Sequence, residues 1–241
     1  MPRNHGHIDD RTTMHAAFTT TAVNIDGKLD DPVWQTAPAY QLNLSRDKQA
    51  EGAKLAEHGW VQLAHDDDNL YIAIRFDDSD VVSEGDSDQL HHYRLGDVAE
   101  VFLKPVAAEH YWELYLTPRG YKTVFFYPSR CHLGLPSSFE AHDVGLRVAA
   151  DVQGSTGDWH DRDTGWAGEM AIAKAKLSAM GVPVTPDQPW TILIGRYNYS
   201  RYLHNVEHSM CPSLSTTNFH LVDEYAPLIL GPTATVQEPV Q

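Results

Sequence analysis

YRLGDVAEVFLKPVAAEHYWELYLTPRG, residues 93–120, contains two runs of alternating residues joined by a turn, which predicts a β-hairpin. Glu100 lies inside the otherwise apolar first run. In the second run one face is apolar and the other carries Tyr111, Glu113 and Tyr115, because side chains alternate across a strand. A sheet face of acids and phenols suits contact with a polar ligand. The alternative for Glu100 is a solvated position at an edge or a pairing with a cation.

Similar patterns occur along the rest of the chain. Residues 59–80 predict a second hairpin, and further strands are expected at 122–127, 145–152, 165–172, 190–199 and the end of 217–230. Residues 174–180 predict one short helix. About ten short strands and one helix indicate an all-β fold, an antiparallel β-sandwich. Its single core is expected to hold Trp34, Trp60, Ile72, Val101, Leu114 and Ile194.

Length and charge bound the function. We expect one domain over residues 21–232, a mobile arm at 1–20 and a tail at 233–241. The 18 basic residues against 33 acidic ones disfavour nucleic acid and anionic membranes as partners. No apolar run approaches the length of a spanning helix, so membrane insertion is not expected. Residues 1–13 lack the apolar core of a signal peptide, and the oligomeric state is open.

Six motifs, taken together, resemble the family 9 carbohydrate-binding modules. They are IDGKLDDPVW (25–34), DDDNLYIAIRFDDSD (66–80), GDVAEVFLKP (96–105), YWELYLTPRG (111–120), GWAGEMAI (165–172) and NFHLVDEYAPLIL (218–230). Their order covers nearly the whole chain from about residue 20. The resemblance implies a DOMON-like β-sandwich, often calcium-bearing, that in the best-known members grips the end of a glucan or xylan chain between two aromatic side chains.

Carried over by position, the resemblance places the acidic ligand contact on Glu100 and a further polar contact on Tyr115. The two sandwiching tryptophans of the family fall on Arg94, beside Tyr93, and on Phe219. Because an arginine replaces an aromatic face only partly, a cellulose-type ligand does not follow. The chain is most similar to stand-alone members, whose ligands are mostly uncharacterised. The resemblance implies a secreted or periplasmic protein, with a cytoplasmic location as the alternative.

A saccharide-binding protein is the first interpretation of the function. Its ligand-binding residues would be Tyr93, Arg94, Glu100, Tyr115, Arg196 and Phe219. Arg196 is included as a mid-strand cation that could pair with Glu100.

An enzyme on the same scaffold, a polysaccharide lyase or hydrolase, is the second interpretation. The chain has 14 histidines, and histidine suits proton transfer near neutral pH. In a lyase, Arg94 or a metal would neutralise a uronate while a tyrosine or histidine abstracts the proton. The catalytic candidates are His91, His92, Tyr93, Arg94 and His220. A protein-interaction domain is the third interpretation.

Two further features concern metals and thiols. The acidic stretch 77–88 could supply oxygen ligands to Ca²⁺, with Asp78, Asp80 and Asp86 as the candidates, although its spacing is not that of an EF-hand and a solvated loop is the alternative. Cys131 and Cys211 are too few for a disulfide scaffold. They either pair in an exported protein or remain thiols. The long segment 128–142 is expected to border the site, since long loops are often functional.

Overall fold

The structure is a computed structural model that describes residues 12–130 and 144–231. In chain order the strands are β1 (Met14–Phe18), β2 (Ala39–Gln41), β3 (Gly59–His65), β4 (Asn69–Asp77), β5 (Val98–Pro105), β6 (Tyr111–Leu116), β7 (Lys122–Tyr127), β8 (Arg147–Gln153), β9 (Gly165–Ala173), β10 (Trp190–Asn198), β11 (Glu207–Cys211) and β12 (Ala226–Leu230). The helices are α1 (Arg46–Ala50) and α2 (Lys174–Ser178), with single turns of 3₁₀ helix at η1 (Pro32–Gln35), η2 (His92–Arg94) and η4 (Val222–Glu224).

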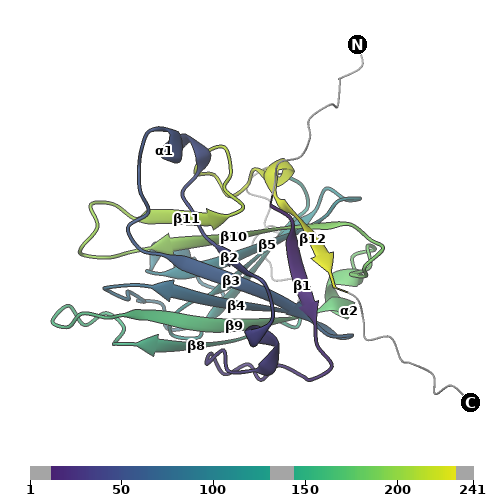
Figure 1. Ribbon diagram of the computed structural model, residues 1–241, viewed down its shortest axis with the longest axis horizontal. Helices are drawn as coiled ribbons and strands as arrows, with labels where there is room; N and C mark the ends of the chain where they lie inside the picture. The colour runs from purple at the N-terminus through teal and green to yellow at the C-terminus, as the bar shows by residue number, and fades with distance from the viewer. Residues whose placement is uncertain (1–11, 131–143, 232–241) are drawn as a thin grey trace, which may run out of the picture.

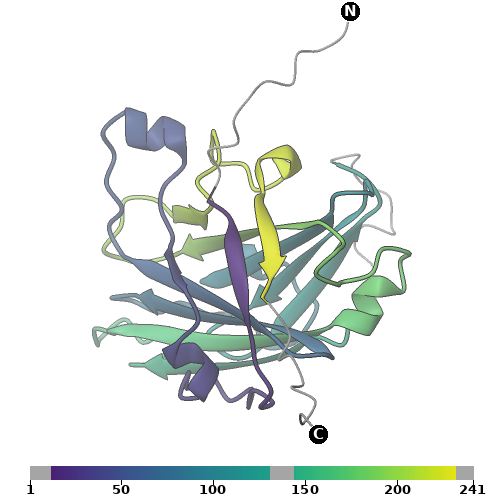
Figure 2. The ribbon, with the colours of Figure 1, turned by 45° about the vertical axis from the view of Figure 1, so that its right-hand side comes forward.

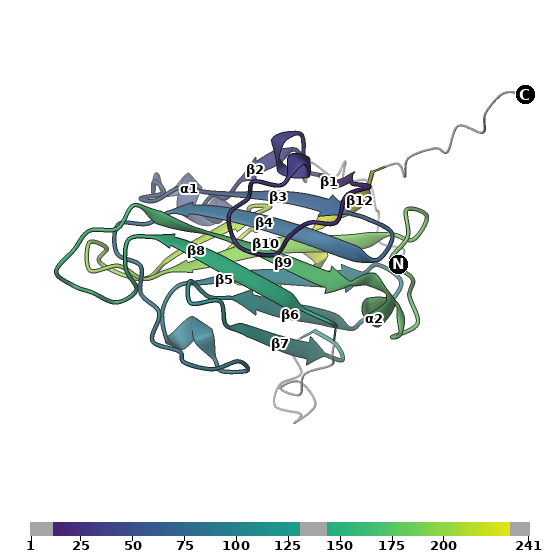
Figure 3. The same cartoon turned by 90° about the horizontal axis from the view of Figure 1, so that it is seen from below.

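The strands form two layers joined along one side. Hydrogen bonding connects them in the order β7-β6-β5-β10-β12-β1-β3-β4-β9-β8, with β11 beside β10 and β2 beside β3. Seen from below, β5, β6 and β7 form one layer and β3, β4 and β9 the other (Figure 3). β1 and β12 lie side by side where the layers connect (Figure 1, Figure 2). β1 runs parallel to both β12 and β3, and the remaining strand pairs between described residues are antiparallel.

The main core fills the space between the layers. It contains Ile72 of β4, Val101 of β5, Leu114 of β6 and Ile194 of β10, all fully buried, which confirms the predicted parity of these strands. Each strand alternates, so the residues of opposite parity lie on the outer faces of the sandwich. The outer face of β5, β6, β10 and β11 therefore carries the side chains that are polar in the sequence pattern.

Two predicted core residues lie elsewhere. Trp34, on η1, packs in a smaller cluster on the outer face of β3, β4 and β9, where its Nε1 donates to Glu169 Oε1 at 2.8 Å. Trp60 is half-buried on that same side of β3, under the guanidinium of Arg75 at 5.4 Å. The prediction of one core for both residues was therefore wrong. Trp34 belongs to the segment that covers this outer face, where apolar residues are needed as well, and Trp60 has the parity of Arg75, which places it on the outer face.

Several short elements of the structure were not predicted from the sequence. Residues 14–18 of the expected arm form β1 between two strands, and β2, α1 and β11 were not predicted. The described part of the chain thus has two short helices instead of one. Strands of three to five residues show too few alternations to stand out from loops. The predicted tail, 233–241, and most of the segment 128–142 lie outside the described residues.

Candidate functional site

The outer face of β5 and β6 carries the acids and phenols of the predicted hairpin. In the antiparallel pairing Glu100 lies opposite Tyr115, and Phe102 lies opposite Glu113. Residues that face each other across such a pair point to the same side of the sheet, so these four side chains share one face. This face is opposite the main core, and the segment that follows β11 covers it through Leu214, Phe219 and Tyr225.

A pocket of about 220 Å³ opens on this outer face. It is bounded by strands β5, β6, β10 and β11 and by residues 217–220. Its lining residues are Glu100, Phe102, Glu113, Tyr197, His208, Thr217, Asn218, Phe219 and His220. Two of the six predicted ligand-binding residues, Glu100 and Phe219, therefore line one pocket.

Phe219 reaches this pocket because its neighbour on β10 is a glycine. Gly195 pairs with Glu100 of β5, and an added Cβ at Gly195 would lie 2.5 Å from Cε2 of Phe219. The ring takes the place that a side chain at 195 would fill, and it meets Phe102 and Tyr197 with ring centroids 6.0 Å and 5.8 Å away. A glycine inside a strand marks such a close approach.

Replacing Gly195 by Ala should displace the Phe219 ring and weaken ligand binding about tenfold, with a loss of about 1–3 kcal/mol in the free energy of unfolding from the overpacking. Gly59→Ala is the matched control, because a Cβ there would lie 2.7 Å from the Phe76 ring, away from the pocket. Denaturant titration and ligand affinity measured on both variants check this. Equal affinity in the two variants would contradict the role given to Phe219.

The two glutamates of the pocket form a buried carboxyl pair. Their residues are 1% and 4% exposed, and the Tyr115 hydroxyl donates to Glu113 Oε1 at 2.5 Å. Glu100 Oε1 and Glu113 Oε2 are buried without a hydrogen-bond partner among the described residues. Buried polar atoms of this kind are uncommon and call for an explanation.

Burial sets the protonation of this pair. It raises the pKa of Glu113 to about 7, although hydrogen bonds from Tyr115 and Tyr127 act to lower it. The pKa of Glu100 is raised well above its ordinary value, first by burial and then by the negative charge of Glu113. Two adjacent buried carboxyl groups do not both ionise readily, so the pair favours holding a proton near neutral pH.

The stability of the protein should therefore decrease as the pH rises. Because the folded-state pKa of Glu113 lies above its ordinary value of 4.5, its contribution is fully present below pH 4.5 and is lost as the pH passes through about 7. The unfolding free energy should fall by at most about 1.4 kcal/mol per pH unit for this one proton. Urea titrations of the wild type and Glu113→Gln between pH 5 and 8 isolate the effect, and identical slopes would refute it.

Two histidines face the same pocket. Nδ1 of His220 lies 2.9 Å from the Tyr111 hydroxyl, and the His220 ring packs edge-on against Phe102. His208 of β11 packs edge-on against Tyr197. Burial lowers the pKa of both histidines, so both are neutral near pH 7 and add no positive charge to the pocket.

The other predicted residues at this face lie beside the pocket. The Tyr93 ring contacts Tyr115 and Tyr197, with centroids 6.5 Å and 5.8 Å away. Arg94 is exposed, with its guanidinium 5.2 Å from the Tyr93 ring. His91 is exposed and packs against Tyr93, whereas His92 is buried and stacks on Tyr121. Of the five catalytic candidates only His220 lines the pocket.

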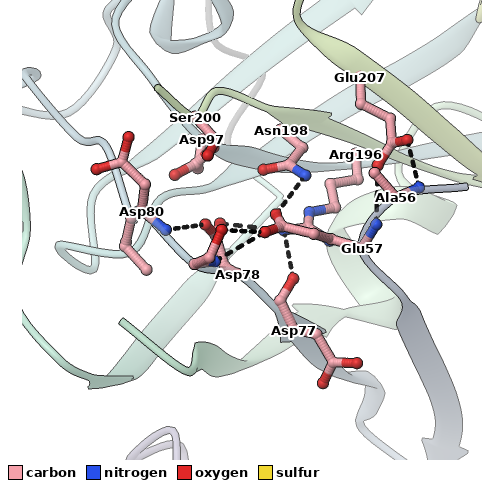
Figure 4. Close-up of polar contacts among 12 residues, drawn as sticks. Ala56, Glu57, Asp77, Asp78, Asp80, Asp97, Arg196, Asn198, Ser200 and Glu207 are labelled. Carbon is pink, nitrogen blue, oxygen red and sulfur yellow. Dashed lines mark hydrogen bonds and ion pairs between the residues drawn. The ribbon is translucent and has the colours of Figure 1, made fainter. Parts of the chain in front are cut away.

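Arg196 is not part of this face, and its predicted pairing with Glu100 is wrong. Its cross-strand partner on β5 is Ala99, which points toward the core. The fully buried guanidinium donates to Asp78 Oδ2 at 3.0 Å and to the Asp77 carbonyl at 2.9 Å (Figure 4). It also lies over the Phe76 ring and 3.9 Å from Glu57 Oε2. Arg196 is therefore a structural cation at one end of the sandwich.

The three predicted calcium ligands do not form a shared site. Asp78 binds Arg196, Asp80 is 2.8 Å from Arg201 Nη1, and Asp86 is exposed. Within residues 12–130 and 144–231 no three His, Cys, Asp or Glu side chains gather around a common point. These aspartates do not fit a calcium site as arranged. Calcium binding stays a prediction, checked by the melting temperature with added calcium or EDTA.

Several residues that line the pocket were not among the predicted ligand-binding residues. Alternation placed Glu113 on the same face as Tyr115, but Glu113 was not included among the predicted ligand-binding residues. Tyr197 likewise has the parity of Gly195, whose presence inside a strand was a usable signal. His208 could not be found, because β11 was not predicted and its pairing with β10 sets the position. Cys211 is a buried thiol, while Cys131 lies outside the described residues.

Comparison with known proteins agrees with this architecture. Residues 25–124 match the family described as carbohydrate family 9 binding domain-like. A protein of Bacteroides uniformis has 11% identity and a TM-score of 0.68, over 91% of this chain and 99% of that one. A family 9 module of Caldicellulosiruptor kristjanssonii solved with cellotriose has 12% identity and a TM-score of 0.64, over 95% and 100% of the two chains. A structure of a family 9 module from the same organism, solved with glucose, has 13% identity and a TM-score of 0.62, over 94% of this chain and 100% of that one.

A comparison with curated proteins gave no match. The family match begins at Ile25 and ends at Val124, inside β7, and it includes both pocket glutamates. The solved structures share the fold over nearly the whole chain. This chain therefore carries a carbohydrate family 9 binding domain-like region and has the overall fold of the family 9 carbohydrate-binding modules.

Proposed function

We propose that the protein binds a saccharide in the pocket on the outer face of β5, β6, β10 and β11. The observation that carries this proposal is the pair of unpartnered carboxyl oxygens, on Glu100 and Glu113, beside the ring of Phe219. Sugar hydroxyls donate to carboxylates, and the C–H surface of a sugar ring packs on an aromatic face. The solved modules with glucose and cellotriose support this proposal.

The size of the pocket favours a short ligand or the end of a chain. Its 220 Å³ lies below the range of roughly 300–1,000 Å³ typical of small-molecule sites. One sugar ring would fill most of it, with any further rings outside. Thr217 and Asn218 are exposed at the pocket and can contact such rings. We include a secreted or periplasmic location in this proposal, in keeping with binding to an external saccharide.

No specific observation favours the lyase. That reaction needs a cation against the uronate carboxylate, and no Lys or Arg is among the described residues that line the pocket. Arg94 is engaged with the Tyr93 ring and exposed. Likewise, nothing on the described surface points to a particular protein partner. Among the helices in the described ranges, none has the length and apolar character needed to cross a membrane.

Calorimetric titration with gluco-, xylo- and manno-oligosaccharides tests the proposal on the full chain. At least one sugar should bind, and Phe219→Ala should weaken its binding about tenfold or more. Tyr202→Ala is the matched control, since this tyrosine is 51% exposed and outside the pocket. Failure of all sugars to bind, or equal weakening by both variants, would overturn the proposed site.

A further inference from the structure

The described lining of the pocket contains two acids and no lysine or arginine. Glu100 and Glu113 are its two acids, and its histidines, His208 and His220, are neutral near pH 7. The phenols of Tyr197, Tyr115 and Tyr127, on β10, β6 and β7, have raised pKa values and stay neutral. Thus every described titratable group at the carboxyl pair is either acidic or neutral.

No described arginine forms an ion pair with Glu100 or Glu113. Arg130 is exposed and lies 3.7 Å from Asp223 Oδ2, and its charge contributes to the lowered pKa of His220. Arg94 is held over the Tyr93 ring. Arg196, the one fully buried arginine in the described ranges, points to the opposite face of β10 and binds Asp78.

This arrangement is unusual because buried carboxylates are normally matched by a cation. An unpaired buried charge costs several kcal/mol, and here two acids adjoin one pocket with one free oxygen each. A neutral sugar can donate hydrogen bonds to these oxygens but leaves the charge in place. An acidic sugar would bring further negative charge beside the two acids. A ligand with a positive charge supplies both the donors and the missing charge.

The walls of the pocket fit a cation as well. Phe102, Tyr197 and Phe219 line the same pocket as the carboxyl pair. An ammonium group is attracted to the face of an aromatic ring, more strongly where water is excluded. The formal net charge of −15 also raises the local concentration of cations around the whole protein.

We propose that the saccharide bound in this pocket is an amino sugar with a free amine, whose ammonium group lies between the carboxyl groups of Glu100 and Glu113. This inference rests on the proposed saccharide binding and specifies the chemical class of the ligand. An ammonium carries three N–H donors, enough to serve both unpartnered oxygens.

Matched sugar pairs test the inference on the wild-type chain. Affinities are measured at pH 7 for glucosamine and glucose, galactosamine and galactose, and mannosamine and mannose, with N-acetylglucosamine and glucuronate as uncharged and acidic comparisons. At least one amine should bind about tenfold or more tightly than its parent sugar, the gain of one charge-assisted contact. N-acetylglucosamine should lose that gain, and glucuronate should bind more weakly than glucose.

A pair of variants assigns the preference to the carboxyl groups. Glu113→Gln keeps the shape but removes one charge, so the advantage of the amine should fall below about threefold. Glu51→Gln removes an exposed carboxylate at the C-terminal cap of α1 and should keep the full advantage. The sugar pairs decide the question on wild type alone if Glu113→Gln does not fold.

The outcomes separate this inference from the function on which it rests. Parent sugars that bind as tightly as their amines in all pairs would overturn the amine preference and leave saccharide binding standing. If neither these sugars nor the oligosaccharides bind, the proposed function itself fails. An amine advantage that Glu51→Gln reduces as much as Glu113→Gln would mean that the preference comes from overall charge, which would also overturn the assignment.

Discussion

Replacement of Arg196 by methionine is expected to lower the free energy of unfolding by about 3–5 kcal/mol, the cost of breaking a buried ion pair by removing one partner. Methionine retains much of the apolar stem and its contact with Phe76. It leaves Asp78 buried without its cation, removes the donor to the Asp77 carbonyl, and removes the positive charge that lies 3.9 Å from Glu57 Oε2. Urea titration at pH 7.5 measures the loss.

The pH dependence of this loss identifies its cause. Burial raises the pKa of Asp78 to about 6 even with Arg196 present, so the lone acid of the variant should take up a proton more readily still. The destabilisation should therefore be smaller at pH 5 than at pH 7.5. Arg75→Met is the control, because Arg75 is exposed on β4 and its described cation–π contact is with the Trp60 ring. It should cost less than about 1 kcal/mol. A pH-independent loss in Arg196→Met would point to packing instead.

The role of Arg196 also shows where sequence patterns stop being informative. Arg196 has the same parity as Ile192 and Ile194, which places it on the core side of β10. Glu100 lies on the opposite face of β5, so the two could pair only if the strands slipped by one residue. Alternation fixes the face of a side chain within one strand. Alternation does not specify the register between strands that are distant in the sequence, and this register determines which side chains become cross-strand partners.

The candidate site shows the same division. The face of Glu100, Glu113 and Tyr115 follows from alternation within residues 93–120, and the pocket does open on that face. Its remaining walls come from Tyr197 of β10, His208 of β11 and residues 217–220, all distant from residues 93–120 in the sequence. Tertiary packing brings Phe219 onto Gly195, and no local pattern specifies that contact.

Replacement of Glu100 by glutamine should weaken saccharide binding roughly tenfold or more, the loss expected for one charge-assisted hydrogen bond. The amide keeps an acceptor but carries no charge, and its NH₂ group cannot accept from a ligand. Stability should be unchanged or slightly higher at pH 8, because the substitution removes one of two adjacent buried acids and no cation depends on Glu100. Affinity and urea titrations on one preparation measure both effects.

Glu169→Gln provides the opposite result for comparison. Glu169 is also a fully buried mid-strand glutamate, but its carboxylate accepts from Gly27 N at 2.9 Å and Trp34 Nε1 at 2.8 Å on the other layer. A glutamine turns a donor group toward one of these N–H donors, so this variant should lose about 1–3 kcal/mol of stability and keep its affinity. A ligand-specific defect in Glu100→Gln together with a stability defect in Glu169→Gln separates a binding carboxylate from a structural one. If Glu100→Gln loses stability and retains its affinity, Glu100 is structural and the pocket binds through other residues.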